Sequence, residues 1–112
     1  MDDFKHIVVF ITTADKEEAQ LISKVLLEQR KAACVNMVPK VSSVYWWQDK
    51  IESGKESLLI VKTKAVLLED LIAVVREVHS YENPEILALP VCGGSPVYLE
   101  WLDEVLSTEA EE

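Results

Sequence analysis

Hydrophobic and polar positions along the chain alternate between strand-like and helix-like patterns. Residues 7–11 read Ile-Val-Val-Phe-Ile, and this β-branched and aromatic run predicts a central strand covered on both faces. Asp15 and Glu18 then have the spacing of a capping box, and the apolar residues that follow keep helical spacing. The pattern predicts a first helix that continues to Lys31.

The second half of the chain contains a hairpin pattern and then repeats the alternation. Residues 34–47 and 51–63 are rich in β-branched and aromatic side chains, and Gln48-Asp49-Lys50 between them is turn-like, which predicts a long β-hairpin. A second helical pattern runs from Leu68 to Val78 and ends where His79 begins. Two short elements remain, a strand at residues 85–91 after Pro84 and a C-terminal amphipathic helix at residues 97–106.

The order β-α-β-β-α-β predicts a single α+β domain over residues 1–112 with the ferredoxin-like split motif. In this motif one antiparallel sheet carries both helices on one face, and the opposite face lacks a cover. The acidic end, residues 107–112, is expected to be frayed. Tyr45, Trp46 and Trp47 fall at the hairpin tip, where a monomer would leave three large aromatic side chains in water. The pattern therefore predicts self-association.

Composition narrows the class of partner. Eleven basic and twenty acidic residues give a net charge of −9, which disfavours binding to nucleic acid and anionic membranes and favours cations. Cys34 and Cys92 show no Cys-x-x-Cys spacing, and no signal-like segment opens the chain. No apolar run is long enough to span a membrane. These features predict a cytoplasmic protein with reduced thiols.

The candidate chemistry lies between the second helix and the strand that follows. The His79 side chain is suited to three roles, which are metal ligand, proton-transfer group and structural residue at a helix end. Glu82 and Glu85 can accept hydrogen bonds from the backbone, Lys62 or Tyr81, or can coordinate a hard cation. Lys62 ends a hydrophobic strand, where its ammonium points outward or pairs with Glu85. If Lys62 lines the same cleft, the site suits an anionic small molecule.

The sequence offers two tryptophans with a candidate binding role and no recognised catalytic motif. Trp47 and Trp101 are interpreted as interface or core aromatics, with stacking against a planar ligand as the alternative. The sequence contains no P-loop, no Gly-x-Ser-x-Gly elbow, no His-Glu-x-x-His and no Gly-x-Gly-x-x-Gly. We therefore do not expect an enzyme.

Five segments together resemble the CutA family in order and spacing. They are residues 32–36 (AACVN), 43–47 (SVYWW), 62–63 (KT), 79–85 (HSYENPE) and 98–101 (YLEW). The resemblance implies a divalent-cation tolerance protein that binds copper, takes part in the response to metal ions and forms a homotrimer of ferredoxin-like subunits similar to the PII signalling proteins. It also implies that the trimer interface contains the hairpin aromatics and Trp101.

The resemblance also implies a metal site. This chain differs from the family pattern at that site and at several other positions. The positions assigned to copper ligands in some members are Ile11, Val78 and His79 in this chain, and only His79 keeps a metal-binding side chain. Ser80 stands where the family usually has Pro, and Lys40 and Asp49 stand where it usually has Gly.

Two functions follow from these observations. The first is a homotrimer that binds Cu²⁺ or another divalent cation through His79. The alternative is a PII-like signalling or scaffold trimer that binds a small metabolite, without metal, in a cleft between subunits. The cleft residues are Lys62, His79, Tyr81, Glu82 and Glu85, with Trp47 beside them.

Overall fold

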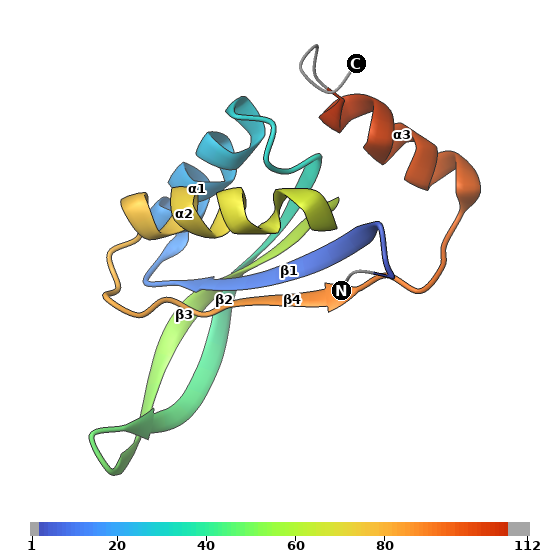
Figure 1. The fold of residues 1–112 in the computed structure, drawn as a ribbon. Coiled ribbons are helices and arrows are strands. Elements are labelled where there is room, and N and C mark those ends of the chain that lie inside the picture. Colours follow the sequence, from blue (N-terminus) through green and yellow to red (C-terminus); the bar gives the residue numbers. More distant parts are fainter. Residues whose placement is uncertain (1–2, 108–112) are drawn as a thin grey trace.

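The computed structural model describes residues 3–107, which form a four-stranded antiparallel sheet with two helices packed on one face (Figure 1). The elements, in chain order, are β1 (His6–Thr13), α1 (Lys16–Glu28), β2 (Cys34–Trp47), β3 (Lys50–Lys64), the 3-10 turn η1 (Ala65–Leu67), α2 (Leu68–Val78), β4 (Ile86–Pro90) and α3 (Pro96–Leu106). Across the sheet the order is β2-β3-β1-β4. The predicted ferredoxin-like α+β arrangement is therefore confirmed, and the predicted bounds agree with the observed ones within three residues.

The core lies between the sheet and the two helices α1 and α2. Alternate residues of β1, from Ile7 to Thr13, are fully buried beneath the helices, whereas the residues between them stay half-buried on the other face. The prediction that this central strand is covered on both faces is wrong for the single chain, because α1 and α2 both cover the same side of the sheet. The open face carries Leu87 and Leu89 of β4, which are 58% and 44% exposed.

Helix α1 ends at Glu28, three residues before the predicted Lys31. Arg30 adopts a positive φ of 57° just after the helix. The backbone N–H of Lys31 then donates to the carbonyl of Leu26 at 2.9 Å, and that of Arg30 donates to Leu27 at 3.1 Å, which is the Schellman pattern of helix termination. The apolar spacing alone did not contain this stop signal because the left-handed position is occupied by arginine instead of glycine.

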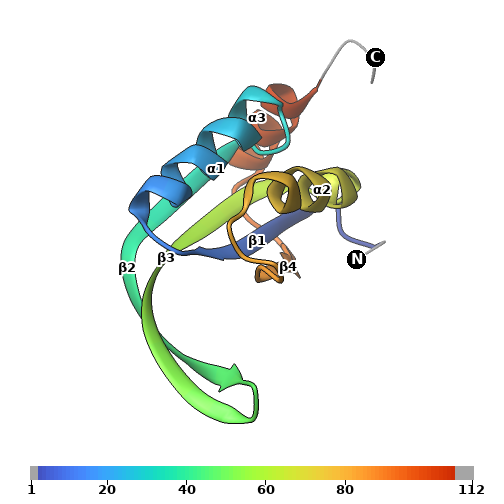
Figure 2. The ribbon, with the colours of Figure 1, turned by 90° about the vertical axis from the view of Figure 1, so that its left-hand side faces the viewer.

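The β2–β3 hairpin extends well beyond the helices and curves to one side (Figure 2). A break in the β2–β3 register between Val38 and Val41 accompanies this curve, and the Ser57 hydroxyl donates to the carbonyl of Pro39 there at 2.7 Å. At the tip, Gln48 and Asp49 both have positive φ, 50° and 64°, as a two-residue type I′ turn requires.

Helix α3 stands apart from the two-helix layer, beyond the end of the sheet (Figure 1). Leu102 and Leu106 are its buried side chains and pack against Ala33. Its other side exposes Val97 and Trp101, by 77% and 40%. None of the helices within residues 3–107 has the length and apolar character needed to cross a bilayer.

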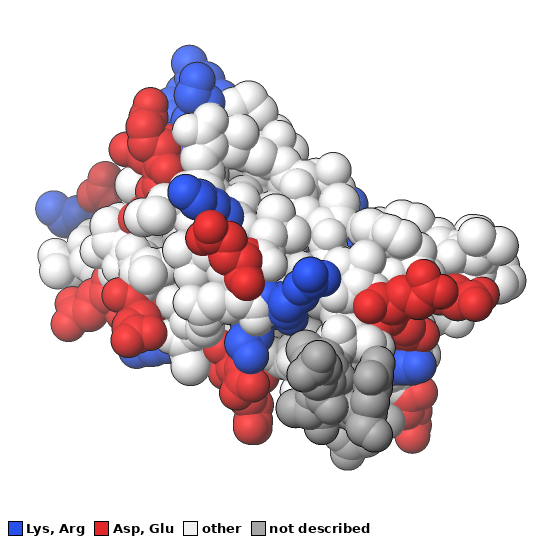
Figure 3. Space-filling model, turned by 90° about the horizontal axis from the view of Figure 1, so that it is seen from above, with Lys and Arg blue, Asp and Glu red and all other residues white. Residues whose placement is uncertain are grey.

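Charged side chains are dispersed over the helix-covered side. Figure 3 shows acidic and basic side chains interspersed there, separated by uncharged surface. Where the described residues form this surface, Figure 3 shows no continuous basic patch of the kind that attracts phosphate backbones.

Candidate functional site

His79 begins the loop between α2 and β4, and its side chain is completely buried. The Nε2 atom lies 2.7 Å from the carbonyl oxygen of Thr12, and the backbone N–H of Tyr81 donates to Nδ1 at 3.0 Å. Because a carbonyl can only accept and a backbone amide can only donate, these contacts assign a neutral imidazole with its proton on Nε2. Both ring nitrogens therefore bind the protein's own backbone.

Glu18 ties the start of α1 to the same loop. Its Oε1 accepts from the backbone N–H of Ala14 at 2.9 Å, and its Oε2 accepts from that of Ser80 at 2.7 Å. Asp15 caps the helix by accepting from the N–H of Glu18 at 2.8 Å, so the capping box is confirmed with a one-residue offset in its second bond. Burial opposes ionisation of Glu18, but the hydrogen bonds outweigh it and lower the pKa of this carboxyl.

The family's copper positions do not form a ligand set within this chain. Ile11 is fully buried in the core and Val78 packs against it, so neither offers an atom to a metal. His79 has a single ring lone pair, and the Tyr81 amide occupies it. Among the described residues no group of three or more His, Cys, Asp or Glu side chains could hold a metal ion. A metal role for His79 stays a prediction, and its hydrogen bonds favour the structural role.

A cavity of about 880 Å³ lies between the tip half of the hairpin and the loop that follows His79. Its residues come from β1, both hairpin arms and the loop, and they are Thr12, Ser42, Ser43, Val44, Tyr45, Trp46, Trp47, Glu56, Tyr81, Glu82, Asn83 and Glu85. Three of these side chains are carboxylates and four are aromatic, and no lysine or arginine is among them. We call this space the hairpin cavity.

Tyr81 and two glutamates set the electrostatics of the hairpin cavity. The Tyr81 hydroxyl donates to Oε2 of Glu56 at 2.8 Å. Burial and this hydrogen bond raise the pKa of Tyr81, so the phenol stays protonated and holds the carboxylate in place. Burial and the neighbouring charge of Glu56 raise the pKa of Glu85. Two like charges therefore share the cavity, and a cation is the ligand that would relieve their repulsion.

The structure brings together most of the predicted site residues but separates Lys62 and Trp101 from them. Tyr81, Glu82, Glu85 and the hairpin aromatics all line the hairpin cavity. Lys62 lies six residues beyond Glu56 on β3, about 20 Å along the strand at the usual rise, and pairs with Cys34 of β2. Lys62 also pairs with Val8 of β1, whereas Glu85 directly precedes Ile86, which pairs with Ile11 on the other side of β1. The two residues are therefore too far apart along and across the sheet for an ion pair within one chain. Trp101 lies on α3, where its ring packs against Tyr98 at 5.5 Å between centroids.

Glu56 is the residue that sequence reasoning missed. It lies in the hairpin opposite Val41, immediately after the register break. Simple alternation along β3 places Glu56 on the open face of the sheet. Alternation does not predict its contact with Tyr81, because that contact depends on the bend of the hairpin. The signal in the sequence was Pro39 inside an otherwise regular strand pattern, because proline within a strand marks an edge or a bulge.

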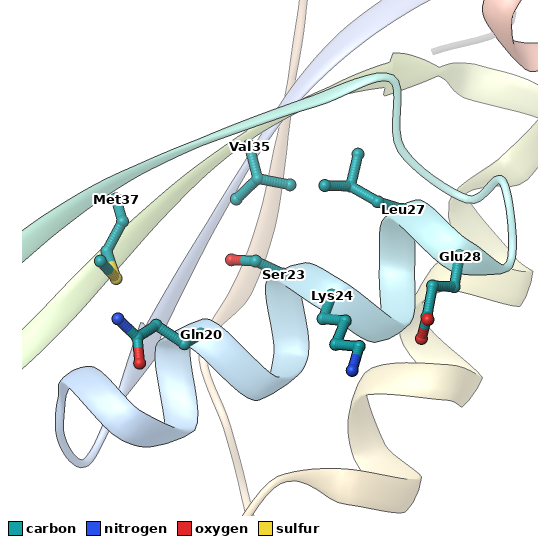
Figure 4. Close-up of a pocket in the computed structure, with 7 residues that line it drawn as sticks. All are labelled: Gln20, Ser23, Lys24, Leu27, Glu28, Val35 and Met37. Carbon is teal, nitrogen blue, oxygen red and sulfur yellow. The ribbon is translucent and has the colours of Figure 1, made fainter.

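A second hollow, of about 530 Å³, lies between α1 and the edge strand β2 (Figure 4). It is lined by Gln20, Ser23, Lys24, Leu27, Glu28, Val35 and Met37. The floor is apolar, with Val35, Met37 and Leu27 pointing into it in Figure 4. The groove carries one lysine and one glutamate at its rim and no cluster of reactive groups.

Comparison with known proteins gives one consistent result. Residues 7–105 match the model of the family described as CutA1 divalent ion tolerance protein. The divalent-cation tolerance protein CutA of Thermus thermophilus is 45% identical over 97 residues, which cover 87% of this chain and 94% of that protein. The chloroplastic protein CutA 1 of rice is 45% identical over 96 residues, or 86% of this chain. This chain spans about half the length of such plant relatives, 54% in the rice protein.

A solved structure agrees with the sequence relatives. The structure titled periplasmic divalent cation tolerance protein CutA from Archaeoglobus fulgidus superposes with a TM-score of 0.89 at 39% identity. The match covers 91% of this chain and 99% of that one. Fold and sequence therefore point to the same group of proteins.

Proposed function

This chain belongs to the CutA1 divalent ion tolerance family, and from that premise we propose that it is a homotrimeric protein that binds a divalent cation in the response to metal ions. The observation that carries the cation part is the hairpin cavity, whose lining includes three carboxylates and no lysine or arginine. Because no three acidic, His or Cys side chains of the described residues form a metal-binding group, a neighbouring subunit must supply further ligands. The net charge of −9 adds a general attraction for cations. The proposed role is binding, and it includes no catalytic step.

Free sheet edges and exposed aromatics support the trimer. Strands β2 and β4 lie at opposite edges of the sheet, so β2 of one copy can pair with β4 of the next in a ring that closes. Trp46 and Trp47 at the hairpin tip are 73% and 58% exposed, and contact with a protein partner would remove this aromatic surface from water. Tyr45 and Trp101 complete the proposed interface.

The chemistry of the hairpin cavity favours a hard cation over copper. Carboxylate and hydroxyl oxygens suit Mg²⁺, Ca²⁺ or Mn²⁺, whereas Cu²⁺ prefers imidazole and thiolate. Copper binding at His79 would require the loss of its bond from Tyr81. Within a single chain the residues present therefore do not fit a copper site, and the proposed ion binds at the carboxylates, completed by groups of a neighbouring subunit.

Calorimetric titration of Mn²⁺ and of Cu²⁺ into the full-length protein tests the cation site. We expect Mn²⁺ to bind, and Glu56→Gln and Glu85→Gln each to weaken it at least about ten-fold, the loss of one charge-assisted contact. Glu52→Gln, an exposed hairpin glutamate outside the cavity, is the matched control and should bind as the parent does. Equal affinity in all four proteins, or no binding at all, would overturn the proposal.

A second candidate function is a PII-like signalling or scaffold trimer that binds a small metabolite at the subunit boundary without metal. Its support is the size and aromatic lining of the hairpin cavity, which suit an organic ligand. Within one chain the carboxylates favour an organic cation. An anionic metabolite would need Lys62 of a neighbouring subunit to enter the cavity.

A thermal-shift screen with amines and with carboxylic acids separates these two ligand classes. Stabilisation by amines that is lost in Glu85→Gln supports an organic cation. Stabilisation by acids that is lost in Lys62→Gln supports an anionic metabolite held between subunits. Absence of both effects, with Mn²⁺ binding intact, would reject this second function and leave the first.

A cytoplasmic location is part of the proposal and rests on the free thiols of Cys34 and Cys92. Relatives carry chloroplastic and periplasmic names, so location varies among them. Cell fractionation against cytoplasmic and envelope markers tests it, and recovery in the envelope or periplasm would contradict it.

A further inference from the structure

Aromatic rings and a carboxylate share one face of the tip half of the hairpin. The register pairs Val41 with Glu56 beyond the break in the ladder. Because strand residues two apart lie on the same face, Tyr45 and Trp47 lie on the face that carries Glu56. Both residues line the hairpin cavity, as does Tyr81 of the loop. The cavity therefore offers aromatic surface together with carboxylates.

Tyr81 holds the loop side of the hairpin cavity in place. Its hydroxyl donates to Oε2 of Glu56 at 2.8 Å, and its backbone N–H donates to Nδ1 of the buried His79 at 3.0 Å. The rings of Tyr81 and His79 also pack with their centroids 4.7 Å apart. Glu82 and Glu85 follow on the same loop and line the cavity. The loop side of the binding surface is thus formed by the fold itself.

Two carboxylates of the cavity lie within electrostatic reach of each other. Burial and the charge of Glu56 raise the pKa of Glu85. Each negative charge therefore makes the other less favourable. A ligand that places a separate positive charge beside each carboxylate relieves this repulsion more fully than a ligand with one charge.

Within one chain, an organic ligand matches the cavity better than a bare ion does. A hard cation needs about six oxygen ligands at close range, and no group of three His, Cys, Asp or Glu side chains among the described residues could hold a metal ion. The volume of about 880 Å³ falls within the range of small-molecule sites, about 300 to 1,000 Å³. Aromatic rings in the lining suit an alkyl chain and the ammonium groups that it carries.

We propose that the hairpin cavity binds a short aliphatic diamine, with its ammonium groups at Glu56 and Glu85 and its methylene chain against Tyr45 and Trp47. The ammonium groups donate charge-assisted hydrogen bonds to the carboxylates, and the rings attract them through cation–π contacts. This assignment rests on the second function proposed above, because it requires an organic ligand in the cavity. A diamine and a divalent ion use the same carboxylates, so the two compete for the site.

The lysines near the cavity lie outside its lining. The tip half of the hairpin carries Lys40, Lys50 and Lys55, which are all exposed. Nζ of Lys55 donates to the hydroxyl of Ser42, which does line the cavity. Cross-strand pairing places Ser42 and Lys55 together on the hairpin face opposite to Glu56. The lining itself therefore carries three acidic side chains and no basic one.

Calorimetric titration of putrescine and of butylamine into the full-length protein tests the diamine site. The two amines have the same carbon chain and differ by one ammonium group. We expect putrescine to bind at least about ten-fold more tightly, the value of one charge-assisted contact. Glu56→Gln and Glu85→Gln should each reduce its affinity to that of butylamine. Glu52→Gln, an exposed change outside the lining, is the matched control and should bind putrescine as the parent does.

Tryptophan fluorescence tests the aromatic part of the site. The chain contains three tryptophans, and Trp101→Phe leaves only Trp46 and Trp47, which both line the cavity. We expect putrescine to change the emission of this variant with the dissociation constant that calorimetry gives. A far-UV circular dichroism spectrum equal to that of the parent checks the fold of each variant.

The outcomes separate this assignment from the functions on which it builds. Equal affinity for putrescine and butylamine overturns the diamine site and leaves a cavity for organic cations. Absence of binding by either amine overturns both, and Mn²⁺ binding in the same protein then leaves only the first proposed function. Putrescine binding that persists in both glutamine variants, or that leaves the emission of Trp101→Phe unchanged, places the amine elsewhere and also overturns the assignment. Tight binding that both glutamine variants lose and Glu52→Gln keeps, with the change in emission, supports it.

Discussion

The loop that begins at His79 and the tip of the β2–β3 hairpin face the same cavity. They differ in whether their side chains and backbone groups find partners within the chain. In the loop, His79 and the amides of Ser80 and Tyr81 all find partners within the chain. At the tip, Trp46 and Trp47 remain mostly exposed and find none among the described residues. The difference teaches that His79, whose side chain is chemically the best metal ligand, uses both ring nitrogens for hydrogen bonds within the fold. The exposed aromatics form the surface at which we propose that a partner binds.

The largest effect is expected for His79→Ala. The substitution leaves the Thr12 carbonyl and the Tyr81 amide without their partner and opens a buried space, so unfolding free energy should fall by about 3 kcal/mol. Urea denaturation measures it. Glu82→Ala, an exposed change in the same loop, is the control and should cost under about 0.5 kcal/mol. Unchanged stability with lost copper affinity would make His79 a ligand and reverse the comparison.

The next effect concerns association. Replacing Trp46 and Trp47 by serine removes the two most exposed aromatics of the tip, so subunit affinity should weaken by about 2 kcal/mol, roughly thirty-fold, while each chain stays folded. Analytical ultracentrifugation over a dilution series measures the shift. Val66→Ser, an exposed apolar residue in η1 that is 79% accessible, should leave association unchanged. An equal loss in both variants would mean that the tip has no special role.

A smaller effect is expected for Glu18, the carboxylate that ties α1 to the loop. Its lowered pKa means that its stabilisation is present above the ordinary carboxyl range and is lost as pH falls through the folded pKa. Glu18→Gln should cost about 1 kcal/mol at pH 7, because a neutral amide accepts more weakly, and should flatten the acid limb of the stability curve. Denaturation at several pH values between 3 and 7 measures this. An acid limb that keeps its slope would exclude Glu18 as the source.

The smallest effect is expected at the turn of the hairpin. Asp49 has a φ of 64°, which glycine adopts without strain, so Asp49→Gly should raise stability by about 0.5 kcal/mol. Thermal unfolding measures the shift, with Asp49→Ala as the comparison that should lower stability. A loss with glycine as large as with alanine would mean that the backbone at the tip is not limiting.

Sequence reasoning recovered the order and type of the elements because β-branched runs and helical spacing, such as that of Ile22 and Leu26, distinguish strands from helices. It did not recover the alternating burial of β1, because the continuous apolar run of residues 7–11 predicts cover on both faces. The end of α1 was missed because a left-handed Arg30 supplies the stop that glycine usually gives. The acidic end beyond Ser107 lies outside the described residues.

The candidate site was recovered for the residues of the loop after His79 and for Trp47, which was expected beside them. Tyr81, Glu82 and Glu85 could be grouped from one segment, and the structure places all three on the hairpin cavity. Glu56 joins them through the bend of the hairpin, and the separation of Lys62 depends on its place along β3. The position of Glu56 at the cavity and the distance of Lys62 from it both depend on the tertiary structure. Hydrogen bonding of His79 likewise depends on Thr12, 67 positions away, which local pattern does not encode.

The central claim is that this chain completes its exposed hairpin by assembling with two further copies. Native mass spectrometry of the full-length protein at micromolar concentration, repeated by sedimentation equilibrium, tests it most directly. The account predicts a species of three times the 12.7 kDa chain mass, with no folded monomer at these concentrations. A stable monomer of 12.7 kDa that keeps its fold with Trp46 and Trp47 in water would contradict it.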